Sequence, residues 1–231
     1  MTIFQDFQDA LAQLSDRKFQ RIFWRALSLT ILALIAVYIG FTYLIDWIVP
    51  DTMTLPWVGE IDLLSTVLEA GALIAMFALS AFLMFPVAAI VIGFFLEDIA
   101  EAVEAKHYPH LPTAKRIPLG PALVDSLKFM GLLILVNALA LLIYLVSTVF
   151  APFVFWAVNG FLLGREYFQL VAARRIGMKA ATNLRKKHFA QIWLAGILMA
   201  IPLSVPVINL MVPFLGVAVL THQFHRLKDH G

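Results

Sequence analysis

The sequence contains no cysteine, which excludes disulfide bonds, thiolate metal ligands and a cysteine nucleophile. Charged residues are scarce, because Asp, Glu, Lys and Arg make up 14% of the 231 residues, against about 25% in an ordinary soluble domain. A formal net charge of +2 is too small for the basic surface of a nucleic-acid-binding protein. The phosphate-binding glycine loop and the H-E-x-x-H and G-x-S-x-G motifs are missing as well. We therefore expect neither an enzyme nor a bound cofactor.

Apolar residues dominate the chain, at 61% of its length, and they gather in four long blocks. A helix rises about 1.5 Å per residue and the hydrocarbon core of a bilayer is about 30 Å thick, so about 20 apolar residues span it. The blocks at 22–49 and 63–96 exceed this length and are predicted to be transmembrane helices. The sequence thus predicts an all-α integral membrane protein, with residues 1–231 forming a single membrane domain.

The positions of the basic residues indicate which block ends share one side of the membrane. All 17 Lys and Arg lie before residue 26, at 106–128, at 165–187 or after residue 225. The connection between the first two blocks has none. Because cytoplasmic loops carry an excess of Lys and Arg, the first two blocks are predicted to cross once each, and the last two to return to the face they left. Both chain ends are then cytoplasmic.

The blocks at 129–164 and 189–221 are therefore predicted to be helical hairpins. Proline lacks a backbone N–H and clashes with the preceding helical turn. Prolines interrupt both blocks, at Pro152, Pro202, Pro206 and Pro213. The two arms of the last block are about 20 Å and 22 Å long, too short to cross, and the second arm of the third block is also too short. We expect two re-entrant half-membrane hairpins; the alternative for the last block is a kinked but complete span that leaves the C-terminus outside.

Helices that begin inside a membrane point free N–H groups and a positive dipole end at their tips, where transporters hold anions. The candidates for a pore or anion path are the polar residues of the two hairpins: Asn159, Arg165, Glu166 and Asn209. The competing interpretation is structural. It gives the asparagines helix-packing hydrogen bonds, and it makes Arg165 and Glu166 a salt bridge at the membrane edge.

The segment "SVPVINLMVPFLGVAVLTHQFHRL" resembles the C-terminal signature of the bacterial CysZ-type sulfate permeases. The similarity extends in order over nearly the whole chain, through "SDRKFQRIFWRALSLTIL", "FPVAAIVIGFFLEDIAEAVE" and "APFVFWAVNGFLLGREYFQLVAARR". The resemblance implies two long transmembrane helices and half-membrane hairpins in a homo-oligomer. It also implies passage of sulfate across the bacterial inner membrane for sulfur assimilation and cysteine biosynthesis.

The resemblance further implies a sulfate-binding motif before the first transmembrane helix. The family's motif is approximately P-G-[I/L]-R-R, with sulfate held by backbone amides and arginine. The corresponding residues here are Arg17, Lys18, Phe19, Gln20 and Arg21. Lys18 replaces the glycine and Gln20 one arginine, while Arg21 matches, so Arg17, Lys18 and Arg21 are the candidate sulfate ligands. The alternative is a basic anchor that meets anionic lipid headgroups.

Residues 1–20 are predicted to form an amphipathic interfacial helix. Phe4, Phe7, Leu11 and Leu14 recur at helical spacing, with acidic and amide residues between them. Because the polar side lacks basic residues, we expect the helix to pack on the protein or on a neighbouring subunit as much as on lipid.

Two pairs of histidines have the spacing of one helical turn: His107 with His110, and His222 with His225. No carboxylate or thiol at a convincing spacing completes either pair as a metal site. We expect surface histidines and no bound metal.

Two functions fit these features. One is a sulfate permease, in which helix ends and arginines attract the dianion; the other is a non-transporting membrane scaffold or assembly protein. The apolar blocks contain few polar side chains. A pore would therefore depend on backbone dipoles or on residues pooled from several subunits.

Overall fold

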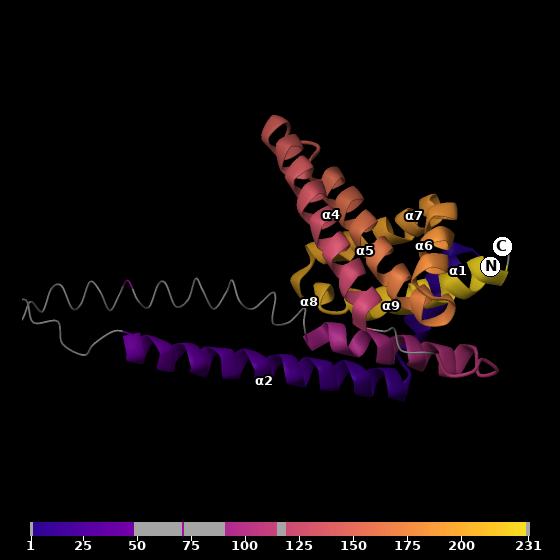
Figure 1. Ribbon diagram of the computed structural model, residues 1–231, viewed down its shortest axis with the longest axis horizontal. Helices are drawn as coiled ribbons and strands as arrows, with labels where there is room; N and C mark the ends of the chain where they lie inside the picture. Colours follow the sequence, from indigo (N-terminus) through magenta and orange to yellow (C-terminus); the bar gives the residue numbers. More distant parts are fainter. Residues whose placement is uncertain (1, 49–70, 72–90, 115–118, 230–231) are drawn as a thin grey trace, which may run out of the picture. The chain divides into compact units, whose positions relative to one another are not determined.

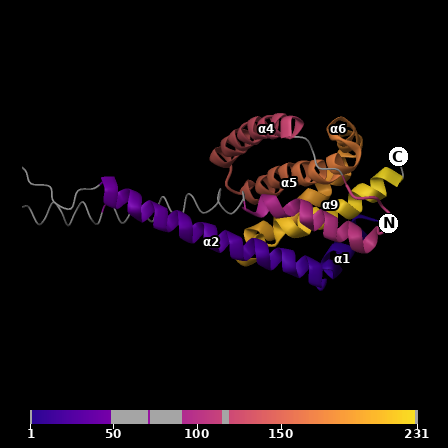
Figure 2. The same ribbon diagram turned by 60° about the horizontal axis from the view of Figure 1, so that its bottom comes forward.

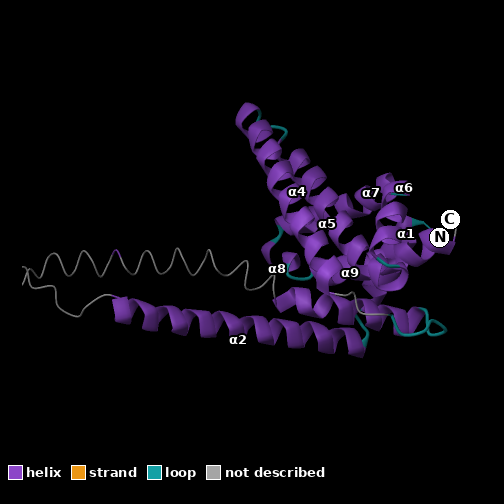
Figure 3. Cartoon of the chain, viewed as in Figure 1, coloured by secondary structure: helices purple, strands orange, loops and turns teal. Residues whose placement is uncertain are grey.

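The computed structural model describes residues 2–48, 71, 91–114 and 119–229. Within these ranges the chain forms helices and short loops and no strand (Figure 3). The predicted all-α class is therefore confirmed. The chain divides into two compact units, one made of 1–22 with 96–231 and the other of 23–95.

The unit of residues 23–95 contains most of helix α2 (Arg17–Ile48). The segment Arg17–Gly40 is long and apolar enough to cross a membrane, and only 17% of its most apolar window is buried. Exposed apolar side chains along such a helix suit contact with lipid, as predicted for the first block. The predicted second transmembrane helix, 63–96, lies outside the described residues except for residue 71 and its end, which is helical from 91 and continues to 107.

Helix α1 (Ile3–Gln13) begins with a capping box. The Gln5 backbone N–H donates to the Thr2 hydroxyl at 3.4 Å, and the Thr2 backbone N–H donates to the Gln5 side-chain carbonyl at 2.7 Å. The buried side of α1 consists of Asp6, Ala10 and Gln13, and it packs on α9 (Figure 1). Phe4 and Leu11 of the predicted apolar row remain 70% and 52% exposed. The helix therefore contacts the protein through its small and polar residues.

The first hairpin consists of α4 (Leu119–Val146) and α5 (Ala151–Ile176), which lie side by side in both views (Figure 1, Figure 2). Pro152 occupies the first turn of α5, where its missing N–H has no helical partner to lose. Both arms extend beyond the predicted hairpin of 129–164. Helix α4 already begins at Leu119, and α5 continues through Arg165 to Ile176. The segment Val124–Val146 of α4 is also long and apolar enough to cross a membrane.

The second hairpin follows α6 (Met178–Lys187) and starts with α7 (Phe189–Ala200). Its tip is irregular, with a 3-10 turn η1 (Ile201–Ser204) and the single turn α8 (Pro206–Asn209). The return arm is α9 (Val212–Asp229). At 12 residues, α7 is about 18 Å long and too short to cross. The depth that either hairpin reaches in a membrane stays a prediction.

The core of the larger unit forms where α5, α7 and α9 meet. Val217, Ala218 and Leu220 of α9 are fully buried, so this apolar arm faces protein. Glycines allow α5 and α7 to touch through their backbones: a Cβ at Gly196 would lie 1.8 Å from the Gly160 carbonyl oxygen. Small residues permit this close approach in membrane helix pairs as well.

Replacing Gly196 by alanine is expected to push α7 away from α5, because the obstacle is backbone and not a flexible side chain. Overpacking of this kind costs about 1–3 kcal/mol. Gly131→Ala is the matched control, since nothing lies within 4 Å of a Cβ there. Thermal unfolding in detergent should show a lower midpoint for Gly196→Ala and an unchanged or higher one for Gly131→Ala. Equal midpoints would contradict the close contact.

Candidate functional site

A buried cluster of charged side chains lies where three helical segments of the larger unit meet. Glu104 comes from the helix at 91–107, Arg174 and Arg175 from the last turn of α5, and His225 from α9. We call these four residues the Glu104 cluster. Glu104 is 3% exposed, Arg174 7% and His225 4%. Charged groups are almost never buried in this way unless they are paired.

Glu104 accepts hydrogen bonds from two of its three neighbours and pairs with the third. Arg175 donates through Nε at 2.8 Å and through Nη2 at 2.7 Å, a bidentate contact, and His225 Nε2 lies 3.2 Å from Glu104 Oε1. Arg174 Nη2 lies 3.6 Å from Glu104 Oε2. Burial alone would raise the pKa of Glu104, but the hydrogen bonds from His225 and Arg175 and the two arginine charges outweigh it. Together they lower the pKa to about 2.

The Glu104 cluster carries more positive than negative charge. One carboxylate faces two arginines, which leaves a surplus of one positive charge. The helix dipole also stabilises the two arginine charges, because both residues occupy the last turn of α5, where the dipole favours cations. Gly177, at φ 80°, then ends the helix in a conformation that other residues rarely adopt.

A layer of rings extends the cluster toward α1. Tyr108 stacks on His225 at 4.1 Å between ring centroids, and its hydroxyl lies 3.1 Å from His222 Nδ1. His107 packs edge-on to His222, and its Nε2 lies 2.9 Å from the Gln13 side-chain oxygen. The prediction of surface histidines was therefore wrong for His222 and His225, which are 3% and 4% exposed. Helical spacing gives no indication of which face another helix covers.

Three buried nitrogens around the cluster have no hydrogen-bond partner among the described residues: Gln13 Nε2, Arg174 Nη1 and His222 Nε2. The first two are donors, and the third is a donor when Tyr108 donates to Nδ1. A buried donor without an acceptor is costly, and water or another acceptor commonly satisfies such a group in proteins. The cluster combines a surplus of positive charge with these donors, and both features suit an anion.

The sulfate-binding motif predicted before the first transmembrane helix lies at the surface, whereas the Glu104 cluster is buried. Arg17, Lys18 and Arg21 are all exposed. The Asp16 carboxylate caps α2 by accepting hydrogen bonds from the Lys18 and Phe19 backbone amides, at 2.9 Å and 3.0 Å. An anionic group of the chain itself therefore occupies the amides that the family resemblance assigns to sulfate.

Arg165, predicted for the anion path, is 8% exposed and is surrounded by compensating groups. It lies 3.6 Å from Asp125 and 3.5 Å from Glu166, and its guanidinium covers the Phe129 ring at 4.7 Å. Burial raises the pKa of Glu166, although the Arg165 charge opposes this. Arg165 and Glu166 thus form an ion pair, with Asp125 as a third member that the sequence did not indicate.

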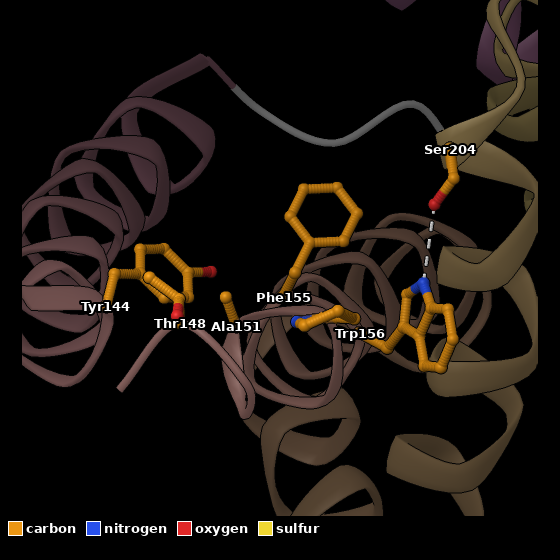
Figure 4. A pocket seen from close by; sticks show the side chains of 7 residues that line it. Tyr144, Thr148, Ala151, Phe155, Trp156 and Ser204 are labelled. Carbon is orange, nitrogen blue, oxygen red and sulfur yellow. Dashed lines mark hydrogen bonds between the residues drawn. The ribbon is translucent and has the colours of Figure 1, made fainter. Parts of the chain in front are cut away.

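The two asparagines lie near the hairpin tips. Asn159 donates to the Phe155 carbonyl of its own helix at 2.8 Å, so this donor is already engaged. Asn209 ends α8 and is half-buried. Between the tips is an open pocket of about 460 Å³. Trp156 donates across it to Ser204 at 3.4 Å (Figure 4). The pocket is lined by Tyr144, Thr148, Ala151, Pro152, Phe155, Trp156 and Ser204, a mostly apolar set that offers an anion few donors.

The fold and the cluster together define a helical membrane protein with an arginine-rich polar centre. The sequence matches the family described as sulfate transporter CysZ/etoposide-induced protein 2.4 over residues 6–213, and the chain belongs to this family. The predicted family is therefore confirmed, and its description names a sulfate transporter. A search of curated proteins found no match.

Replacing Glu104 by glutamine keeps the shape of the side chain but leaves two buried arginines without a counter-charge. Removing one partner of a buried ion pair costs about 3–5 kcal/mol. Glu101→Gln is the control, because its side chain is 59% exposed and its pair with Lys18 is long, at 3.8 Å. Thermal unfolding should show a large loss for Glu104→Gln and almost none for Glu101→Gln. Similar midpoints for the two variants would show that the Glu104 cluster contributes little to stability.

Stability is also expected to fall in mild acid because of His222. Burial, with smaller effects from His107 and His225, lowers its pKa from 6.5 to about 4. Between these values the unfolded chain binds a proton that the folded chain does not, so the free energy of unfolding decreases as the pH falls from 6.5 to about 4. The contribution of Glu104 is retained until the pH drops below 4.5.

Unfolding curves over this pH range would measure the effect. His222→Gln should flatten the dependence, because glutamine does not titrate. His110→Gln, at an exposed position, should leave the dependence unchanged. A slope that is the same in all three proteins would show that His222 is not the group responsible.

Proposed function

We propose that this protein conducts sulfate across the bacterial inner membrane, supplying sulfur for assimilation into cysteine. The family match over residues 6–213 is the observation that carries the proposal. The Glu104 cluster supports it independently, because a buried surplus of positive charge with unpartnered donors suits a small dianion.

Arg174 is the proposed principal contact for sulfate. Its Nη1 is buried and has no partner within the ranges that the structure describes, and its Nη2 is 3.6 Å from Glu104, too far for a hydrogen bond. The guanidinium is thus charged and only partly engaged. Arg175, by contrast, is committed to Glu104 through two short bonds and positions that carboxylate. Sulfate would approach Arg174 on the side away from Glu104, whose negative charge repels it.

The same ion pairs would also limit leakage. At rest the Glu104 carboxylate partly neutralises both arginines, so other anions meet a weaker attraction. Two negative charges on sulfate compete with the single charge of Glu104 for Arg174, and this competition would favour the dianion. A monovalent anion such as chloride competes less well on charge alone.

The remaining predicted residues take supporting roles in this proposal. Arg17, Lys18 and Arg21 form an exposed basic patch that attracts sulfate to the cytoplasmic side. Arg165, Glu166, Asn159 and Asn209 would line the route along α5 and the hairpin tips. Because Arg165 is neutralised by two carboxylates, its direct attraction for sulfate is weaker than that of Arg174.

A homo-oligomer is part of the proposal. The apolar span of α4 is only 6% buried, and the pocket at the tips is mostly apolar. One copy thus provides few polar groups to a membrane-crossing path, and several copies together would provide more. The same scarcity supports the alternative, a non-transporting membrane scaffold that uses its exposed hairpin to assemble partners.

Uptake of labelled sulfate into proteoliposomes distinguishes the two functions. The protein should take up sulfate above the level of empty liposomes. Arg174→Gln removes one charge-assisted hydrogen bond, worth about 1.5–3 kcal/mol, and should lower uptake about tenfold or more. The fold should survive, because Glu104 keeps its bidentate contact with Arg175. Arg21→Gln and Arg165→Gln should lower uptake less.

Lys179→Gln is the matched control, because it removes an exposed positive charge from α6. Its uptake should equal that of the unchanged protein, and all variants should elute from size exclusion as folded protein. If neither the unchanged protein nor any variant transports sulfate while a control transporter does, the result supports the scaffold function and contradicts the permease function.

A further inference from the structure

Helix α1 presents three different surfaces along its length. The first, made of Asp6, Ala10 and Gln13, is buried against the protein. The second is an exposed apolar edge that carries Phe4 and Leu11, seven residues and nearly two turns apart. The third is an exposed edge with Gln5 and Ala12, and Gln8 lies between this edge and the second. The first surface therefore suits contact with protein, the second contact with an apolar phase, and the third contact with water.

The buried side of α1 is held firmly, so the other two surfaces have fixed directions. Asp6 is 2% exposed and accepts from Arg226 of α9, through Nη2 at 2.7 Å and Nε at 3.1 Å. At the other end of the helix, Gln13 is fully buried and contacts His107 at 2.9 Å. With both ends attached, α1 cannot rotate Phe4 and Leu11 inward.

We propose that α1 lies in the lipid–water interface, with the Phe4–Leu11 edge inserted into the phospholipid layer and the Gln5–Ala12 edge in water. The occupant of the apolar edge is the bilayer surface. Helices of this kind bury their apolar side about 5–10 Å into the boundary between headgroups and acyl chains. This inference is independent of sulfate transport.

Chain connectivity places α1 at that depth. Its last residue, Gln13, is four residues from Arg17, where the candidate membrane span Arg17–Gly40 begins. Four residues reach about 14 Å at most. The exposed basic residues Arg17, Lys18 and Arg21 are the type that meets lipid headgroups at the start of a span. The end of α1 therefore cannot lie far from the headgroup layer.

The size and charge of the edge favour lipid over a second copy of the chain. A stable protein interface buries about 800 Å² on each partner. Two exposed apolar side chains on one edge of an 11-residue helix provide much less. The helix has no basic residue, so apolar insertion and not attraction to anionic lipid would hold the edge in place.

The absence of cysteine makes the proposal directly testable, because a single introduced cysteine carries the only label. Phe4→Cys and Leu11→Cys place a nitroxide on the apolar edge, and Gln5→Cys and Ala12→Cys are matched controls on the polar edge. The full chain is reconstituted in nanodiscs of phosphatidylcholine and phosphatidylglycerol. Relaxation by oxygen, which concentrates in lipid, is compared with relaxation by a water-soluble nickel complex.

Labels at positions 4 and 11 should relax more with oxygen than with nickel, and labels at 5 and 12 should show the reverse. The pattern should persist in phosphatidylcholine alone, because it does not depend on anionic lipid. Nickel access at positions 4 and 11 equal to that at 5 and 12 would place the edge in water and overturn the proposal. Shielding from both reagents, with spin–spin broadening, would show that a second copy covers the edge and would also overturn it.

Discussion

The ion pairs of Glu104 are the constraint on which the larger unit depends. A carboxylate that is 3% exposed cannot stay charged without partners, and its partners come from the end of α5 and from α9. Glu104 therefore holds three helical segments together, although Glu104 and His225 are 121 positions apart in the chain. Apolar packing alone would not specify this arrangement, because apolar contacts have no direction.

From the Glu104 cluster the polar contacts continue outward to α1. Tyr108 connects His225 to His222, His107 connects His222 to Gln13, and Arg226, next to His225, holds Asp6. Polar residues thus connect α1, α9 and the helix at 91–107, while glycines connect α5 to α7. The unit has a polar centre at one end of α5 and apolar hairpin tips at the other, an arrangement that suits a protein partly in water and partly in lipid.

Three buried nitrogens beside the Glu104 cluster have no hydrogen-bond partner in the part of the chain that the structure describes: Arg174 Nη1, His222 Nε2 and Gln13 Nε2. Arg165 shows the opposite case, with two carboxylates and an aromatic ring around it. The sequence favoured Arg165 because it adjoins an apolar arm, whereas the fold leaves Arg174 as the arginine with capacity for a ligand.

The sequence by itself determined the helical class, the family and the proline positions at which helices begin, because apolar block length and missing N–H groups act locally. It could not determine that Asp6 and not Phe4 faces the protein, or that His222 and His225 are buried. Their partners are Arg226 for Asp6, and Tyr108 and Glu104 for the two histidines. Each of these pairs joins residues more than 100 positions apart in the chain. Only the tertiary structure decided them, since helical periodicity shows which residues share a face but not what that face meets.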